Sequence, residues 1–142
     1  MPPRDAFLTF RLDQLSQSAM AKASRIYKAQ LGLNTRELRV IRAIGDAPGL
    51  SSRALSEATF IEQTLVSKHL RKLVDAGHVH RALESADARR VVLHLTRKGE
   101  TIRQEADRLG EEMEREFLSV LTTSELESFN QCIAKLRGWS TP

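Results

Sequence analysis

The chain has 142 residues, of which 41% are hydrophobic and 28% charged, a balance typical of a globular protein and not of a disordered one. No apolar run reaches the ~20 residues of a membrane helix, and one cysteine excludes an internal disulfide. We therefore expect a cytoplasmic protein with one domain over residues 1–142 and no cofactor. Residues 1–99 carry seventeen basic and nine acidic side chains, whereas residues 100–142 carry five and nine. Two interpretations of this asymmetry are about equally supported. One is a surface that binds a polyanion, usually nucleic acid, and the other is ordinary surface charge.

Apolar residues at helical spacing predict a long first helix over residues 6–30. After Gly32, Asn34 or Thr35 is a candidate N-cap for a second helix. Ser51 or Ser52 then begins a short helix, and a further helix follows over residues 63–76, closed by Gly77. Two short helices joined by a tight turn, the second one basic, indicate a helix-turn-helix.

The pattern changes to alternating β-branched residues over 78–83 and 90–95, with a polar turn over 84–89. This predicts a β-ribbon directly after the helix-turn-helix. Thr96 then caps a long helix from near Arg97, and Thr123 or Ser124, with Glu125 or Glu127, caps a last helix that we expect to end at Gly138. The predicted fold is mainly α with a small β-ribbon: a winged helix-turn-helix core with long terminal helices.

The terminal helices are more apolar than a small winged-helix core requires. A twofold dimer covers such surface at least cost, and the alternative is a monomer whose termini fold back. We therefore expect a DNA-binding lobe over residues 34–99 and dimerisation arms over residues 6–30 and 100–138.

In a helix-turn-helix, the exposed face of the second helix enters the major groove. Gln reads adenine, Arg or Lys reads guanine, and Ser or Thr contacts bases or phosphates. The predicted DNA-binding residues of this helix are Gln63, Thr64, Ser67, Lys68 and Arg71, with Lys72 at the edge.

The predicted tip of the ribbon carries Asp87, Arg89 and Arg90. An arginine at such a tip fits a narrow minor groove, where negative potential is concentrated. Asp87 is placed to orient Arg89 through a bidentate pair. The alternative is a surface salt bridge that only stiffens the turn, worth about 0–1 kcal/mol.

The segment from Asp87 through Arg89 to Leu95-Thr96 resembles the D-x-R-x5-L-T wing signature of the MarR family of transcriptional regulators. The stretch 66–77 is similar to the family's recognition helix and closing glycine. The resemblance implies a winged-helix homodimer that binds double-stranded DNA at a pseudo-palindromic operator, usually as a repressor. It also implies release of DNA when a small anionic or phenolic effector binds between arms and lobes. His69 departs from the apolar residue common there, and the first helix lacks the cysteine of the peroxide-sensing branch.

Other functions fit the sequence less well. If the ribbon turns near Ala86, His78 lies opposite His94 and, with His80, offers three imidazoles to zinc or copper, although alternation places all of them on the solvent face. Cys132 fits a small core residue better than a redox switch. No catalytic motif is present, so an enzyme is not expected, and the acidic last third argues against an architectural DNA-binding protein.

The aromatic residues at the first helix have two possible roles. Phe7, Phe10 and Tyr27 either line an effector pocket or belong to the dimer core, and we favour the core for at least two of them.

Overall fold

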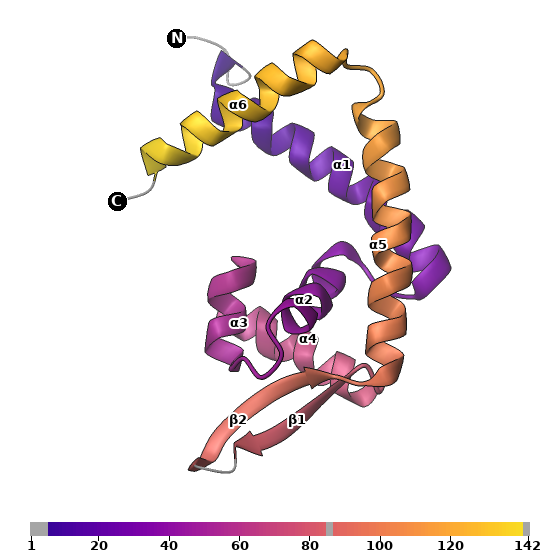
Figure 1. Cartoon of the computed structure of the whole chain (residues 1–142), viewed down its shortest axis with the longest axis vertical. Coiled ribbons are helices and arrows are strands. Elements are labelled where there is room, and N and C mark those ends of the chain that lie inside the picture. Colours follow the sequence, from indigo (N-terminus) through magenta and orange to yellow (C-terminus); the bar gives the residue numbers. More distant parts are fainter. Residues whose placement is uncertain (1–5, 85–86, 141–142) are drawn as a thin grey trace. The chain divides into compact units, whose positions relative to one another are not determined.

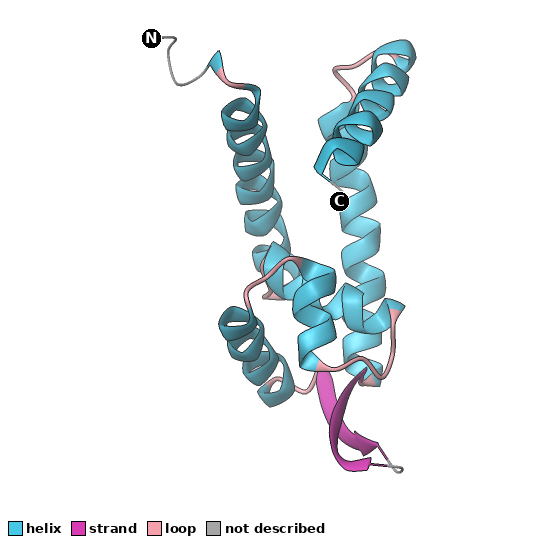
Figure 2. Ribbon diagram, turned by 90° about the vertical axis from the view of Figure 1, so that its left-hand side faces the viewer, coloured by secondary structure: helices cyan, strands magenta, loops and turns pink. Residues whose placement is uncertain are grey.

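A computed structural model describes residues 6–84 and 87–140, and the side chains of these residues except 87–89. The described chain is mainly helical with one two-stranded antiparallel ribbon, as predicted (Figures 1 and 2). The elements in order are α1 (Leu8–Leu31), α2 (Thr35–Asp46), α3 (Ser52–Thr59), α4 (Gln63–Asp75), β1 (Val79–Glu84), β2 (Asp87–Leu95), α5 (Arg97–Leu118) and α6 (Thr123–Ser140). Two compact units are found, residues 1–109 and residues 110–142.

Three of the predicted N-caps are confirmed. Asn34 forms a capping box with Glu37, in which the Glu37 N–H donates to Asn34 Oδ1 over 2.9 Å and the Asn34 N–H donates to Glu37 Oε2 over 3.1 Å. Ser51 Oγ accepts from the Ala54 N–H at 3.1 Å. Thr96 Oγ1 accepts from the Gly99 N–H at 3.0 Å. These local bonds satisfy N–H groups that the first helical turn leaves without partners.

The prediction for the last helix is wrong at both ends. Its cap is Thr122, whose Oγ1 accepts from the Glu125 N–H at 3.1 Å while Glu125 Oε1 accepts from the Thr122 N–H at 2.9 Å. The cap thus lies one residue before Thr123 and two before Ser124, while its partner Glu125 is one of the two that were predicted. The helix also continues through Gly138 to Ser140, because one glycine inside a helix costs only about 1 kcal/mol.

The core lies between α2, α3, α4 and the ribbon, all within residues 1–109. Its largest members are aliphatic, as the low aromatic content predicts. The side chains with almost no exposure are Leu38, Val40, Ile41, Ile44, Leu55, Val66, Leu73, Val79 and Leu93. This packing fixes which face of α4 points away from the protein.

The register of the ribbon differs from the prediction. His80, not His78, pairs with His94, because a bulge between Leu83 and Glu84 places extra residues on β2 and shifts the register by two. The expectation that His78 faces solvent is also wrong, since only 6% of it is exposed. Its carbonyl accepts from the Thr96 N–H at 3.1 Å, where the chain passes from the ribbon into α5.

The N-terminal half of α1 is exposed, while its C-terminal end is anchored. Leu8, Leu12 and Leu15 are 40–48% exposed, whereas Tyr27 is only 4% exposed. Near that end, Ser24 Oγ lies 2.8 Å from Thr35 Oγ1 of α2. The first helix therefore packs on its own unit at one end and presents apolar surface at the other.

The unit formed by residues 110–142 has little core of its own. Every described residue of α6 is at least partly exposed. Cys132 is exposed, so the expectation of a core cysteine is wrong for the single chain. The large exposed apolar residues of this unit are Phe117, Val120, Phe129, Ile133, Leu136 and Trp139. No helix within the described residues is long and apolar enough to cross a membrane.

Candidate nucleic-acid interface

The turn between α3 and α4 is held by side chains of α3. Ser56 Oγ donates to the Ile61 carbonyl at 2.6 Å, and Thr59 Oγ1 accepts from the Ile61 N–H at 3.4 Å. Ile61 anchors the turn in the core with 6% exposure. Phe60, between Thr59 and Ile61, has a left-handed φ of 57° and is 93% exposed. The turn therefore has a fixed geometry and carries one strained, exposed aromatic residue.

Helix α4 has one buried face and one solvent face. Val66, Leu70 and Leu73 are buried against the rest of the lobe. Six of the eight residues predicted to contact DNA lie on this helix, the other two being Arg89 and Arg90 of the wing. The six are all exposed: Gln63, Thr64, Ser67, Lys68, Arg71 and Lys72. Gln63 Nε2 also donates to Ser52 Oγ of α3 at 2.8 Å, which links the two helices at the start of α4. An exposed helix face with three cations and no carboxylate suits a phosphate-lined groove.

Lys72 is engaged within the protein. Its Nζ donates to Glu37 Oε1 of α2 over 2.6 Å, and the Glu37 side chain is only 3% exposed. Burial alone raises the pKa of Glu37, but the hydrogen bonds from Lys72 and Asn34, with the charges of Lys72 and Lys28, leave this pKa lowered. The hydrogen bond to Glu37 raises the pKa of Lys72. Lys72 therefore joins α4 to α2, whereas Lys68 and Arg71 lie exposed on the same helix.

The wing is described in part. Arg90 Nε lies 3.4 Å from Glu84 Oε2, with both side chains substantially exposed. The side chains of Asp87 and Arg89 lie outside the described residues, so the expected Asp87–Arg89 pair stays a prediction.

Arg42 of α2 joins three helices of the residue 1–109 unit. Its Nε donates to Asp107 of α5 at 2.7 Å, and its Nη2 donates to both the Tyr27 hydroxyl at 3.2 Å and the Ala106 carbonyl at 3.0 Å. Burial lowers the pKa of Arg42, but the bonds to Tyr27 and Asp107 outweigh it, so the pKa is raised. Sequence reasoning missed this network, because its members are up to 80 residues apart.

The histidines do not form the predicted three-imidazole face. His80 and His94 stack with ring centroids 5.3 Å apart, while His78 is buried and its Nδ1 has no hydrogen-bond partner. Burial, with the charge of Lys98, lowers the pKa of His78, and burial lowers the pKa of His69. Among the described residues, no group of three metal-binding side chains is assembled.

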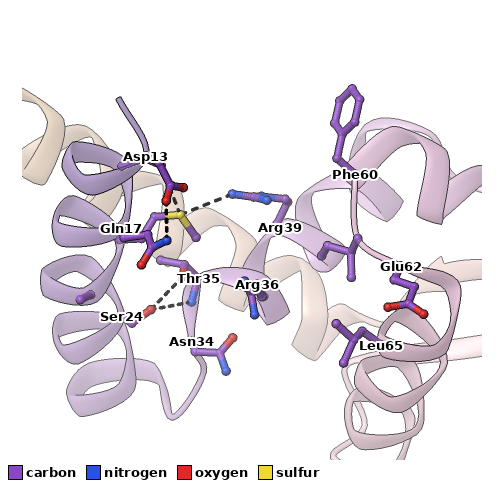
Figure 3. Close-up of a pocket in the computed structure, with 14 residues that line it drawn as sticks. Asp13, Gln17, Ser24, Asn34, Thr35, Arg36, Arg39, Phe60, Glu62 and Leu65 are labelled. Carbon is purple, nitrogen blue, oxygen red and sulfur yellow. Dashed lines mark hydrogen bonds between the residues drawn. The ribbon is translucent and has the colours of Figure 1, made fainter. Parts of the chain in front are cut away.

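A cavity of about 680 Å³ lies between α1, the start of α2 and the helix-turn-helix turn (Figure 3). Arg36 and Arg39 supply positive charge, and Asp13 and Glu62 negative charge. The Nη2 of Arg39 lies 4.0 Å from the sulfur of Met20. Figure 3 shows Asp13 and Gln17 on the α1 side of the cavity and Phe60 on the opposite side. The full lining is Asp13, Ser16, Gln17, Met20, Ala21, Ser24, Asn34, Thr35, Arg36, Arg39, Phe60, Ile61, Glu62 and Leu65. The cavity thus combines cations with apolar surface, and it borders both the turn and α4.

The architecture matches known regulators. A solved structure of a MarR/EmrR family transcriptional regulator from Acinetobacter sp. ADP1 superposes with a TM-score of 0.85 at 23% identity, covering 96% of both chains. The structure of Streptococcus pneumoniae FabT in complex with DNA superposes with a TM-score of 0.79 at 20% identity, covering 93% of this chain and 94% of that one. Both likenesses establish the fold.

The sequence comparisons establish the family. A family model described as MarR family matches residues 31–90, which include α2, α3, α4 and most of the ribbon. The transcriptional regulator HosA of Escherichia coli O127:H6 is 32% identical over 123 residues, which cover 87% of this chain and 91% of HosA. HosA is a regulator of transcription. With the winged helix-turn-helix in place, the chain belongs to the MarR family of transcriptional regulators.

Proposed function

We propose that the protein is a sequence-specific repressor in the cytoplasm that binds a pseudo-palindromic operator as a homodimer. The observation that carries this proposal is the solvent face of α4, where Lys68 and Arg71 lie exposed while Val66, Leu70 and Leu73 hold the helix against the lobe. A basic helix fixed in this way can present its side chains to base edges without first becoming ordered. Residues 34–99 then form the DNA-binding lobe.

The homodimer is supported by the exposed apolar surface of the arms, residues 6–30 and 100–138. Leu8, Leu12 and Leu15 of α1 form an exposed stripe at helical spacing. In residues 110–142, the exposed side chains of Phe129, Ile133 and Leu136 on α6 form another. Surface of this kind is costly in water and is typical of an obligate interface. We infer that a second copy of the chain covers this surface, because a twofold-symmetric dimer matches the twofold symmetry of a pseudo-palindromic operator.

The cavity beside the turn supports a ligand response. Arg36 and Arg39 suit an anionic or phenolic effector, and Met20, Ile61 and Leu65 suit its apolar ring. Leu65 belongs to α4 and Ile61 to the turn, so a molecule bound there contacts the DNA-reading unit directly. We infer that the effector biases the position of α4 and lowers affinity for the operator.

The test is selection of genomic fragments by the full chain at controlled salt, followed by titration of the recovered duplex. We expect selective retention, two chains per site, and a loss of base preference in Arg71→Ala. Retention of all fragments alike would indicate an architectural protein, and a monomer at saturation would remove the dimer from the proposal.

The proposed effector site is tested by adding benzoate or phenol to the complex with the selected duplex. Release of DNA by either probe, reduced in Arg39→Ala, supports the cavity as the effector site. Lys22→Ala, which removes a cation of α1 outside the cavity lining, is the matched control. Equal release from the wild type and Arg39→Ala would place the effector elsewhere.

A further inference from the structure

Two large apolar side chains lie exposed on the outer half of the ribbon. Leu83 of β1 pairs with Val91 of β2, and the two residues are 64% and 42% exposed. Val91 also lines a groove with Leu70 and Leu93, so the pair extends an apolar surface and does not stand alone.

The pair continues the stripe that faces the core. Side chains alternate along a strand, so Val79, Arg81 and Leu83 of β1 lie on one face of the ribbon. Their cross-strand partners on β2 lie on the same face: Leu95, Leu93 and Val91. At the inner end of this face, Val79 and Leu93 are only 2% and 1% exposed. Figure 2 shows the ribbon extending beyond the helices, which leaves the outer end of the same face uncovered.

This face of the ribbon adjoins the DNA-reading face of α4. A groove of about 260 Å³ is lined by Ser67 and Leu70 of α4, Ser52 of α3, and Arg81, Val91 and Leu93 of the ribbon. Ser67 is one of the exposed residues that we propose for base or phosphate contact. Val91 of the apolar pair lines the same groove as Ser67 of α4. The pair is flanked by two exposed cations, Arg81 and Arg90, of which Arg90 also lies 3.4 Å from Glu84 Oε2.

We propose that Leu83 and Val91 pack against the deoxyribose rings of the minor groove that neighbours the major groove occupied by α4. The C–H surfaces of these sugars form the walls of the minor groove, and apolar side chains there exclude water without needing phosphate charge. Arg81 and Arg90 provide the charge that holds the ribbon against the backbone. This inference rests on the proposed DNA binding by α4, and it assigns to the wing a contact that does not depend on salt.

The experiment titrates the selected duplex with the wild type, Leu83→Ser and Leu83→Met over a range of salt concentrations. Leu83→Ser should lower affinity about tenfold, because each dimer loses two buried leucines, while the slope of log affinity against log salt stays that of the wild type. Leu83→Met keeps the apolar surface and should bind within about twofold of the wild type. Val92→Ser is the matched control, because Val92 pairs with Ala82 on the opposite face, and it should leave affinity within about twofold. Thermal melts and sedimentation of each variant check folding and dimerisation.

The titrations distinguish a protein that does not bind DNA selectively from one that binds DNA without the contact to sugars. If the wild type retains no DNA selectively, the proposed function fails. If the wild type binds but Leu83→Ser binds equally well, the sugar contact is absent. A reduced salt slope in Leu83→Ser would overturn the inference in favour of a phosphate effect. A change in sedimentation would show that the pair contacts a second copy instead.

Discussion

Removing the Lys72 side chain should weaken the fold and leave the reading of DNA intact. Lys72 is bonded to the buried carboxylate of Glu37 at 2.6 Å, so Lys72→Ala leaves that charge without its nearest partner. Breaking a fully buried ion pair costs about 3–5 kcal/mol. Because Lys72 is 51% exposed and water replaces part of the interaction, we expect a loss of about 2 kcal/mol. In a chain of this size that loss corresponds to a fall in melting temperature of about 4–8 °C.

The matched control is Lys68→Ala, one helical turn earlier on α4. Lys68 is exposed on the proposed DNA face, so its removal should change stability by less than about 0.5 kcal/mol and lower operator affinity by about 1–3 kcal/mol. Thermal melts and titrations over a salt series measure both effects in both variants. Lys72→Ala could instead melt like the wild type and reduce the slope of log affinity against log salt. Lys72 would then contact phosphate, and its role in stabilising the fold through Glu37 would be wrong.

The same ion pair gives a pH dependence with a defined sign. The pKa of Glu37 is lowered in the folded protein, so its ionised form stabilises the fold above the pKa of the unfolded chain. That contribution is lost as the pH falls through the lowered folded pKa. In urea melts, the stability difference between the wild type and Glu37→Gln should therefore be constant near neutral pH and shrink below about pH 4.5. A difference that persists unchanged in acid would contradict the ionised pair.

Three further substitutions test the turn, the junction and the wing. Phe60→Gly should raise the melting temperature, since it relieves about 1 kcal/mol of left-handed backbone strain at a residue that is 93% exposed; a lower value in calorimetry would contradict this. Gly99→Ala should lower the urea midpoint, because its Cβ would overlap the carbonyl of His78, and an unchanged midpoint would show that the junction yields. Arg89→Ala should lower DNA affinity about tenfold with folding intact. The double variant with Asp87→Ala should be no weaker than Arg89→Ala in operator titrations, and additive losses would show that Asp87 acts independently.

Elements governed by neighbouring residues could be predicted from the sequence. The caps at Asn34, Ser51 and Thr96 involve residues three positions apart, and the inward face of α4 follows from helical spacing alone. The cap of α6 was displaced by one residue, because several serines and threonines in a row offer competing caps and only small energies separate them.

Features that depend on distant residues could not be predicted in this way. The Glu37–Lys72 pair joins residues 35 apart, although a helical projection places Glu37 on the same side of α2 as buried Ile41 and Ile44. That position was the available signal for a buried acid. The ribbon register depends on a bulge near Glu84 that polar turn residues do not specify. His78 is buried just before β1, where its carbonyl accepts from the Thr96 N–H, a contact between residues 18 apart.

The proposed reading of operator DNA by α4 within a homodimer underlies the other proposals for this protein. Its most direct test is quantitative binding of wild type and Arg71→Ala to the selected duplex and to single-base variants of each half-site. We expect two chains per duplex and equal sensitivity in both half-sites, with their centres about 10 base pairs or a multiple apart. We also expect Arg71→Ala to lose discrimination at one base pair of each half-site. Discrimination that survives unchanged in Arg71→Ala and Lys68→Ala, or one chain bound per duplex, would contradict it.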